Sequence, residues 1–412
     1  MKTVLAQSVT LGPDAFNTLG STLVLPDDQI TPANLQDADI LITRSKTKIT
    51  RELITGSSLT FYGTCTAGTD HVDIQALADN HIHFADAGGC NANAVAEYVV
   101  ASLLHFEDSQ PDFSIKGATI GIVGHGNVGV RVEEKARALG MKVLINDPPR
   151  AEQAACAQVG EKTRVENLPL NGRNFQGPAT QWQDYVSLNE LLSACDILTL
   201  HVPLIETGNF PTRNFIAAPQ LAQLKHGALL INACRGEVLC GDALRADRQI
   251  AARVLDVWNP EPDFPIDLFD GSDFGTAHIA GHSFEGKFNG TLLCYQKACR
   301  VLGREPTWDY SDYLSPELPE ITLDANELTE AEALRHAVRS CYDIQIDHDA
   351  LAKALRDNPE GRGAAFKTYR NTYHDFRSRR EFPAHTVRCS GYPRAFTDLL
   401  SNLGFQIKHA SQ

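Results

Sequence analysis

The sequence of 412 residues has no apolar run that approaches the roughly 18 to 20 residues needed to cross a bilayer, so no membrane-spanning helix is expected. Its first residues, MKTVLAQSVT, lack the long apolar stretch and the cleavage site of a signal peptide, so we expect a first strand and a cytoplasmic location. None of the ten cysteines forms a Cys-x-x-Cys pair, and we expect reduced core cysteines, with Cys90 and Cys234 among them. The histidines lack ligand spacing with cysteines or carboxylates, so no metal site is expected.

Basic residues are also scarce, since 37 Lys and Arg stand against 51 Asp and Glu, which gives a net charge of −14. A chain this acidic repels the phosphate backbone of nucleic acids, so nonspecific nucleic-acid binding is not expected. A small anionic substrate remains compatible with this charge, because it needs only a local group of Arg or Lys side chains.

Short apolar segments alternate with helical patterns over the first three quarters of the chain. Such alternation predicts parallel sheets with helices on both faces. A long apolar helix is predicted over 94–106, where it joins two domains, and a helix with amphipathic spacing over 127–139. Strands are predicted at 39–43, 59–63, 118–123, 142–146, 196–201, 228–232 and 251–257.

The alternation lapses between residues 150 and 188, which are rich in Gly, Asn, Gln and Pro, so an insertion on the surface is predicted over 151–187. Beyond about residue 306 the composition changes, with helices predicted over 327–357 and a last strand over 385–389. We therefore expect three domains, made of residues 1–105 with 282–306, residues 106–281, and residues 307–412.

A Gly-x-Gly-x-x-Gly motif follows the strand at 118–123 and opens the helix at 127. In this context Gly124 allows a tight turn, Gly126 lets the backbone approach a pyrophosphate at the helix N-terminus, and Gly129 allows close packing of helix and strand. Asp147 ends the next strand, where a carboxylate binds the ribose 2′-hydroxyl and repels a 2′-phosphate. The motif therefore predicts a doubly wound domain that binds NAD rather than NADP.

Three polar residues, Arg235, Glu261 and His278, follow predicted strands whose carboxyl ends share one edge of that sheet. Removing hydride from an alcohol requires a base for the hydroxyl proton, and histidine is suited to that role. A carboxylate beside it orients the ring and favours its charged form, while arginine binds a carboxylate or a developing oxyanion. We expect these three residues to carry the catalysis, although each alone has an ordinary structural explanation.

These segments resemble the D-2-hydroxyacid dehydrogenase family. The motifs Arg-Gly at 235–236, Asp-Val-Trp at 256–258 and His-Ile-Ala-Gly at 278–281 are similar to those of the whole family. The segments TAGTDH at 66–71 and DPPR at 147–150 are similar to the branch that oxidises 4-phospho-D-erythronate to 2-oxo-3-hydroxy-4-phosphobutanoate in vitamin B6 synthesis. The resemblance implies an NAD-binding domain, a flavodoxin-like substrate domain and a small α+β C-terminal domain through which two chains form a homodimer.

The glycine motif and the resemblance together give a set of expected binding residues, of which Ser45, Thr66, Asp147, Asp256 and Gly281 follow from the resemblance. The expected NAD contacts are Gly124, Gly126, Asn127, Val128, Gly129, Asp147, Val202, Asp256 and Gly281. The expected substrate contacts are Arg44, Ser45, Thr66, Ala67, Gly68 and His282, with backbone N–H groups near Thr66 for the carboxylate. Arg44, Lys46 and Lys48 either face the substrate phosphate or form a solvated basic turn.

Two positions depart from the family pattern. Relatives usually carry Tyr where this chain has His282, and they often have Thr where it has Val202. The hydride chemistry is unaffected, whereas the exact substrate stays open between phosphoerythronate and another D-2-hydroxy acid such as phosphoglycerate or glycerate. A non-catalytic NAD-sensing protein on the same fold is a third alternative, and it would not need Arg235, Glu261 and His278 together.

Overall fold

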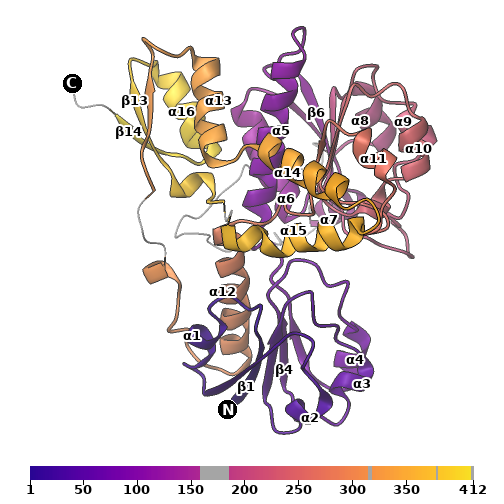
Figure 1. The fold of residues 1–412 in the computed structure, drawn as a ribbon, viewed down its shortest axis with the longest axis vertical. Helices are drawn as coiled ribbons and strands as arrows, with labels where there is room; N and C mark the ends of the chain where they lie inside the picture. The colour runs from indigo at the N-terminus through magenta and orange to yellow at the C-terminus, as the bar shows by residue number, and fades with distance from the viewer. Residues whose placement is uncertain (158–184, 314–317, 377–378, 410–412) are drawn as a thin grey trace. The chain divides into compact units, whose positions relative to one another are not determined.

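Two parallel sheets covered by helices account for most of the chain. The computed structural model describes residues 1–157, 185–313, 318–376 and 379–409 (Figure 1). They form two units, which we call unit 1 (Met1–Asn91 with Ser283–Glu317) and unit 2 (Ala92–His282 with Leu318–Gln412). Among the described residues, no helix is both long and apolar enough to span a membrane.

Unit 1 is built on five parallel strands in the order β2-β1-β3-β4-β5, the flavodoxin order that the resemblance implies. The register pairs Thr43 with Thr64, so the segments that follow β3 and β4 leave the sheet at the same edge. Phe16, Phe61 and Tyr295 are among the buried side chains of its core. The elements are β1 (Lys2–Ala6), α1 (Gly12–Phe16), β2 (Ser21–Leu25), α2 (Pro32–Leu35), β3 (Ile40–Thr43), α3 (Arg51–Ile54), β4 (Phe61–Thr64), α4 (Ile74–Asp79), β5 (His83–Ala85), α12 (Phe284–Val301) and η3 (Ser311–Tyr313).

Unit 2 contains a six-stranded parallel sheet in the order β11-β10-β9-β8-β6-β7. The strand after β7 crosses back to the other side of β6, so the order reverses between β6 and β8, where doubly wound sheets bind their ligands. The predicted strands and the long helix are confirmed to within three residues at each end. The elements are α5 (Ala92–Ser109), β6 (Thr119–Val123), α6 (Asn127–Ala138), β7 (Lys142–Asn146), α7 (Pro148–Ala157), α8 (Leu188–Ala194), β8 (Ile197–Leu200), α9 (Ala218–Leu221), β9 (Leu229–Asn232), η2 (Gly236–Val238), α10 (Gly241–Ala246), β10 (Ala252–Leu255), α11 (Ile266–Asp270) and β11 (Phe274–Gly275).

The predicted insertion over 151–187 stays a prediction, and regular structure is present at both of its ends. Helix α7 continues to Ala157, because an alanine-rich segment favours the helix over a loop. At the other end, Tyr185 already pairs with Ile145 in a parallel bridge beside β7. The remainder of the predicted insertion, residues 158–184, lies outside the described residues.

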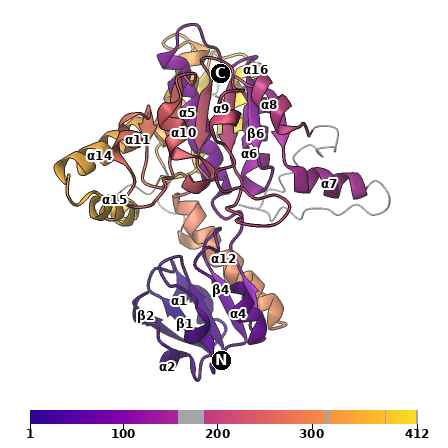
Figure 2. The same ribbon diagram turned by 90° about the vertical axis from the view of Figure 1, so that its right-hand side faces the viewer.

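The C-terminal part of unit 2 has two different components. A three-stranded parallel sheet, ordered β12-β13-β14, packs with α13 and α16, whereas α14 and α15 form a pair of helices beside the larger sheet (Figures 1 and 2). The division into three domains stays a prediction. The elements are β12 (Ile321–Asp324), α13 (Glu330–Cys341), α14 (Ile344–Asp357), α15 (Arg362–Phe376), η4 (Phe382–Ala384), β13 (Thr386–Ser390), α16 (Arg394–Leu403) and β14 (Gln406–His409).

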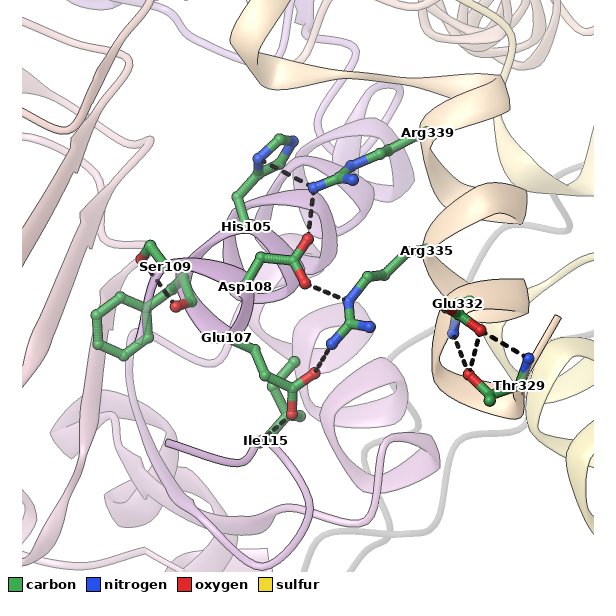
Figure 3. Close-up of polar contacts among 10 residues, drawn as sticks. His105, Glu107, Asp108, Ser109, Ile115, Thr329, Glu332, Arg335 and Arg339 are labelled. Carbon is green, nitrogen blue, oxygen red and sulfur yellow. Dashed lines mark hydrogen bonds and ion pairs between the residues drawn. The ribbon is translucent and has the colours of Figure 1, made fainter. Parts of the chain in front are cut away.

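Ion pairs join α13 to the C-terminal end of α5 (Figure 3). Arg335 contacts Glu107 at 3.3 Å and Asp108 at 2.6 Å, and Arg339 contacts Asp108 at 2.6 Å. These partly exposed pairs fix the direction of α13 on α5 more than they add to stability, since such pairs contribute about 0–1 kcal/mol each.

Candidate active site

The glycine loop after β6 has the geometry that its three glycines predict. Gly124 has a φ of +92°, and a side chain there would meet the carbonyl of His201 at 2.5 Å. A Cβ on Gly129 would lie 2.1 Å from the carbonyl oxygen of Gly124, so only glycine permits this approach of α6 to the loop. At Gly126 no atom lies within 4 Å of that position. The loop is therefore tight on its protein side and open at the N-terminus of α6, as a bound pyrophosphate requires.

Asp147 lies at the end of β7 and contacts the glycine loop. Its carboxylate accepts hydrogen bonds from the backbone N–H of His125 at 2.7 Å and of Arg150 at 3.1 Å. Asp147 thus caps α7 and holds the loop while it remains partly exposed. Asn127 and Val128 begin α6 beside it, and Asn127 is exposed.

The segment after β8 meets the glycine loop at the point where the strand order reverses. A Cβ on Gly124 would lie 2.8 Å from Cγ1 of Val202, so Val202 lines the loop, while its contact with NAD stays a prediction. Its neighbour His201 bonds to Thr199 Oγ1 at 2.9 Å, and burial lowers its pKa to about 3. His201 is therefore neutral near pH 7 and has a structural role in the segment that follows β8.

His278 and Glu261 form a hydrogen-bonded pair. Nδ1 of His278 lies 3.0 Å from Oε2 of Glu261, and Oε1 of Glu261 accepts the backbone N–H of Trp258 at 3.0 Å. Burial raises the pKa of Glu261, but the charges of His278 and Arg370 and the bond to His278 outweigh it, so the net pKa is lowered. An ionised Glu261 fixes the ring orientation of His278 and leaves its Nε2 to exchange a proton.

The turn that carries His278 is held by Asp256. His278 has a φ of +55°, which a non-glycine residue adopts only when its surroundings impose it. Oδ1 of Asp256 accepts from the hydroxyl of Thr276 at 2.6 Å and from the N–H of Ile279 at 2.7 Å, and Oδ2 accepts from the N–H of Ala280 at 2.9 Å. Asp256 is buried. The structure therefore shows that its carboxylate holds the turn that carries His278, whereas the sequence predicted that Asp256 contacts NAD.

Arg235 follows β9. The neighbouring strand, β10, leads to the loop that carries Glu261. The turn of Arg235 is held by Asn232, whose amide donates to the carbonyl of Arg235 at 3.0 Å. A Cβ on the adjacent Gly236 would lie 2.0 Å from the carbonyl oxygen of Trp258, so the Arg235 turn lies against the loop that carries Glu261. Arg235, Glu261 and His278 thus leave three neighbouring strands, β9, β10 and β11, at the same edge.

The predicted substrate residues other than His282 belong to unit 1. Arg44 and Ser45 follow β3. The guanidinium of Arg44 donates to the backbone carbonyl of Cys65 at 3.3 Å. Thr66 follows β4, and its hydroxyl bonds to Thr64 at 2.8 Å and to the carbonyl of Gly68 at 3.0 Å. The two loops therefore lie side by side, with Ser45 and Ala67 exposed, as are Lys46 and Lys48.

Gly281 and His282 end the turn that carries His278 in unit 2. The ring centroid of His282 lies 6.0 Å from that of Tyr373 on α15. The backbone N–H of His282 donates to the carbonyl of Ile279 at 2.8 Å.

Cys234 is buried, and burial raises the pKa of its thiol to about 11, which fits the prediction of a core cysteine.

Sequence reasoning missed the partners that hold this site in place. Thr276 bonds both to Asp256 and to the hydroxyl of Tyr98 at 2.9 Å, and no spacing in the sequence connects these residues. It also missed α15, which lies against the Glu261 loop. Its apolar and aromatic residues at helical spacing indicate a packed face but not the segment against which it packs.

The residues of unit 2 fit NAD. The space beside Gly126, the free N–H groups at the start of α6 and the carboxylate of Asp147 match the pyrophosphate and ribose of a dinucleotide. The arrangement of these groups and of the His278–Glu261 pair on one sheet edge defines a nicotinamide-dependent dehydrogenase site.

Comparison with known proteins agrees with this class. The family model for the D-isomer specific 2-hydroxyacid dehydrogenase NAD binding domain matches residues 91–169 and 173–280, and a domain of unknown function matches residues 314–404. The NAD-bound 3-phosphoglycerate dehydrogenase of Entamoeba histolytica superposes with a TM-score of 0.57 at 23% identity, covering 74% of this chain and 95% of its own. D-lactate dehydrogenase from Aquifex aeolicus has a TM-score of 0.52 at 20% identity, covering 73% and 96%. At these identities the structures establish the fold.

Two relatives give the narrower placement. The erythronate-4-phosphate dehydrogenase of Marinobacter nauticus is 37% identical over 412 residues, which cover 99% of this chain and all of the relative. That of Escherichia coli O157:H7 is 37% identical over 413 residues, which cover 99% of each chain. The chain belongs to the erythronate-4-phosphate dehydrogenases, a branch of the D-isomer specific 2-hydroxyacid dehydrogenase family.

Proposed function

We propose that this protein oxidises 4-phospho-D-erythronate to 2-oxo-3-hydroxy-4-phosphobutanoate, with NAD as the hydride acceptor, in the synthesis of pyridoxal 5′-phosphate. The observation that carries the proposal is the 3.0 Å pair of His278 and Glu261, which shares a sheet edge with the glycine loop in unit 2. Full-length similarity to erythronate-4-phosphate dehydrogenases supports the choice of substrate.

In this mechanism His278 is the general base. The nicotinamide of bound NAD supplies the hydride acceptor. His278 takes the hydroxyl proton of the substrate on Nε2, while the ionised Glu261 stabilises the imidazolium through Nδ1. Arg235 supplies positive charge to the substrate carboxylate or to the developing ketone oxygen.

Apart from Asp256, the binding residues are proposed with the roles that the sequence implies. Gly124, Gly126, Asn127, Val128, Gly129, Asp147, Val202 and Gly281 surround NAD, and Asp256 acts through the turn it holds. Arg44, Ser45, Thr66, Ala67, Gly68 and His282 bind the substrate, whose phosphate is attracted by Arg44. We further propose a cytoplasmic enzyme that forms a homodimer through residues 307–412.

The test is NADH formation by purified protein with 4-phospho-D-erythronate, run in parallel with D-3-phosphoglycerate and D-glycerate. We expect selective turnover of phosphoerythronate, and a loss of about 10²- to 10⁴-fold in kcat in His278→Ala. Consumption of an added 2-oxo acid is followed as well, because tightly held NADH would hide the signal. Preference for another hydroxy acid would overturn the substrate, and binding of NAD without any turnover would favour a sensing protein.

A further inference from the structure

Helix α15 belongs to the C-terminal part of the chain, yet it lies on the loop that carries Glu261. Phe366 of α15 packs edge-on against Phe264 with ring centroids 5.5 Å apart, and Phe264 stacks on Trp258 at 4.3 Å. Near the start of the helix, Gly363 leaves room for the carboxylate of Asp263, whose Oδ1 would be 1.9 Å from a Cβ there. The helix thus contacts the loop directly at Asp263 and Phe264, just after Glu261, and reaches Trp258 only through Phe264.

The second half of α15 reaches the turn that carries His278. The ring of Tyr373 lies 6.0 Å from that of His282, four residues after His278. Arg379, shortly after α15, is buried and donates hydrogen bonds to the carbonyls of Ala280 in this turn and of Ala94 in α5. Segments from the C-terminal part of the chain therefore contact both the loop that carries Glu261 and the turn that carries His278.

Helix α15 is itself fixed in place by α14. The buried carboxylate of Asp347 on α14 accepts the hydroxyl of Tyr369 at 2.8 Å and that of Tyr373 at 3.1 Å. His348 of α14 in turn accepts the backbone N–H of Gly275 in β11 at 2.9 Å and stacks on Phe269 at 5.2 Å. The two helices are thus part of the core of the large sheet, so α15 has a defined position relative to the site.

Arg370 lies on the face of α15 that meets the Glu261 loop. It follows Phe366 by four residues and precedes Tyr373 by three, which are the spacings of one helix face. Arg370 is half-buried, whereas Lys367, one residue after Phe366, is exposed. The charge of Arg370 acts on Glu261, as does that of His278 from the turn after β11.

We propose that α15 is a component of the active site and that Arg370, on the face of α15 that packs on the Glu261 loop, is a positioning residue that acts on His278 through Glu261. The proposal rests on the proposed roles of Glu261 and His278. It assigns to the C-terminal segment a part in the reaction itself, beyond dimer formation.

The test follows the protonation of Glu261 through the N–H of Trp258, which donates to Glu261 Oε1 at 3.0 Å. The chain has three tryptophans, so ¹⁵N-tryptophan labelling gives few backbone signals, and Trp182→Phe and Trp308→Phe assign them. The pH is lowered from about 7 to about 4 in the wild type, Arg370→Gln, Arg370→Lys and the matched control Lys367→Gln. No substrate is required, so a wrong substrate assignment does not affect the result.

We expect Arg370→Gln to move the midpoint of the Trp258 signal upward by roughly half a unit to one unit, because a positive charge near the carboxylate is lost. A transition that becomes visible only in this variant counts as the same result. Arg370→Lys and Lys367→Gln should follow the wild type. An unchanged midpoint in Arg370→Gln would overturn the proposal.

A kinetic measurement separates positioning from a merely structural effect. In the reduction of a 2-oxo acid by NADH, His278 must be protonated and Glu261 ionised, so the acid limb of kcat reports Glu261. Arg370→Gln should lose kcat several-fold more at acid than at neutral pH, with rescue by Arg370→Lys. A loss that is equal at every pH, shared by Arg370→Lys and accompanied by a lower Tm, would contradict the proposal.

Discussion

Oδ1 of Asp256 lies 2.7 Å from the backbone nitrogen of Ile279, the residue that follows the proposed base His278. The same carboxylate accepts from Thr276 and Ala280, so three donors of one turn point at a single buried side chain. Only a side chain that accepts with both oxygens satisfies all three donors. The turn geometry of His278 therefore depends on Asp256.

Asp256→Asn should destabilise the protein and lower its activity. The amide nitrogen must face at least one of the three donors, and a buried donor left without its acceptor costs about 1–3 kcal/mol. Chemical denaturation measures the free energy of unfolding, and NADH formation measures kcat. Asp398→Asn, at a side chain that is 61% exposed, is the control and should change stability by less than about 0.5 kcal/mol. If Asp256→Asn were as stable as the wild type, the carboxylate of Asp256 would not be what holds the turn that carries His278.

The glycine loop allows a matched pair of substitutions. Gly129→Ala places a Cβ 2.1 Å from the carbonyl of Gly124, so both Tm and NAD binding should fall. Gly126→Ala meets no atom within 4 Å, and its stability should change by less than about 1 kcal/mol while NAD affinity falls at least about tenfold. Thermal unfolding and calorimetric titration with NAD measure the two effects. Unchanged NAD affinity in Gly126→Ala would place the pyrophosphate elsewhere.

Asp147 is expected to decide the choice between NAD and NADP. Asp147→Ser retains one short acceptor, which preserves the cap of α7 at the N–H of Arg150 but not the second bond to the N–H of His125. It removes the negative charge that repels a 2′-phosphate, and the ratio of kcat/KM for NADP to that for NAD should rise at least about tenfold. Rates with each cofactor at saturating substrate give the ratio. If the ratio does not change, the ribose is bound by another residue.

The pair of Glu261 and His278 predicts a pH dependence of stability. The pKa of Glu261 is lowered from its ordinary value of 4.5 despite burial, mainly because of the charge of His278. Its contribution to stability is therefore present above pH 4.5 and is lost as pH falls through the lower, folded pKa. The difference in Tm between the wild type and Glu261→Gln should be largest above this pH and shrink in acid. A difference that stays constant across this range would show that Glu261 is not ionised in the pair.

The architecture of the large sheet could be predicted from local patterns. Strands of apolar residues, the helix after Gly126 and the acid at Asp147 each depend on neighbours within about thirty residues, the size of one strand-helix-strand unit. Within the predicted insertion, the weak apolar periodicity did not indicate the helical residues up to Ala157 or the short pairing of Tyr185 with Ile145. Of the C-terminal helices, α13 and α14 fall within the range predicted to be helical, whereas α15 and α16 were not predicted.

The sequence by itself determined the class of enzyme, its dinucleotide loop and the identity of the proposed base, since glycines, strand ends and polar residue types are local features. The tertiary structure alone decided the 3.0 Å contact of His278 with Glu261, the placement of Asp256 beneath the turn and the position of α15 on the Glu261 loop. These contacts join segments up to about a hundred residues apart, and they form because the carboxyl ends of parallel strands and the apolar face of a distant helix meet in one core. The residue pattern within the strands or within α15 does not indicate that these segments pack against each other.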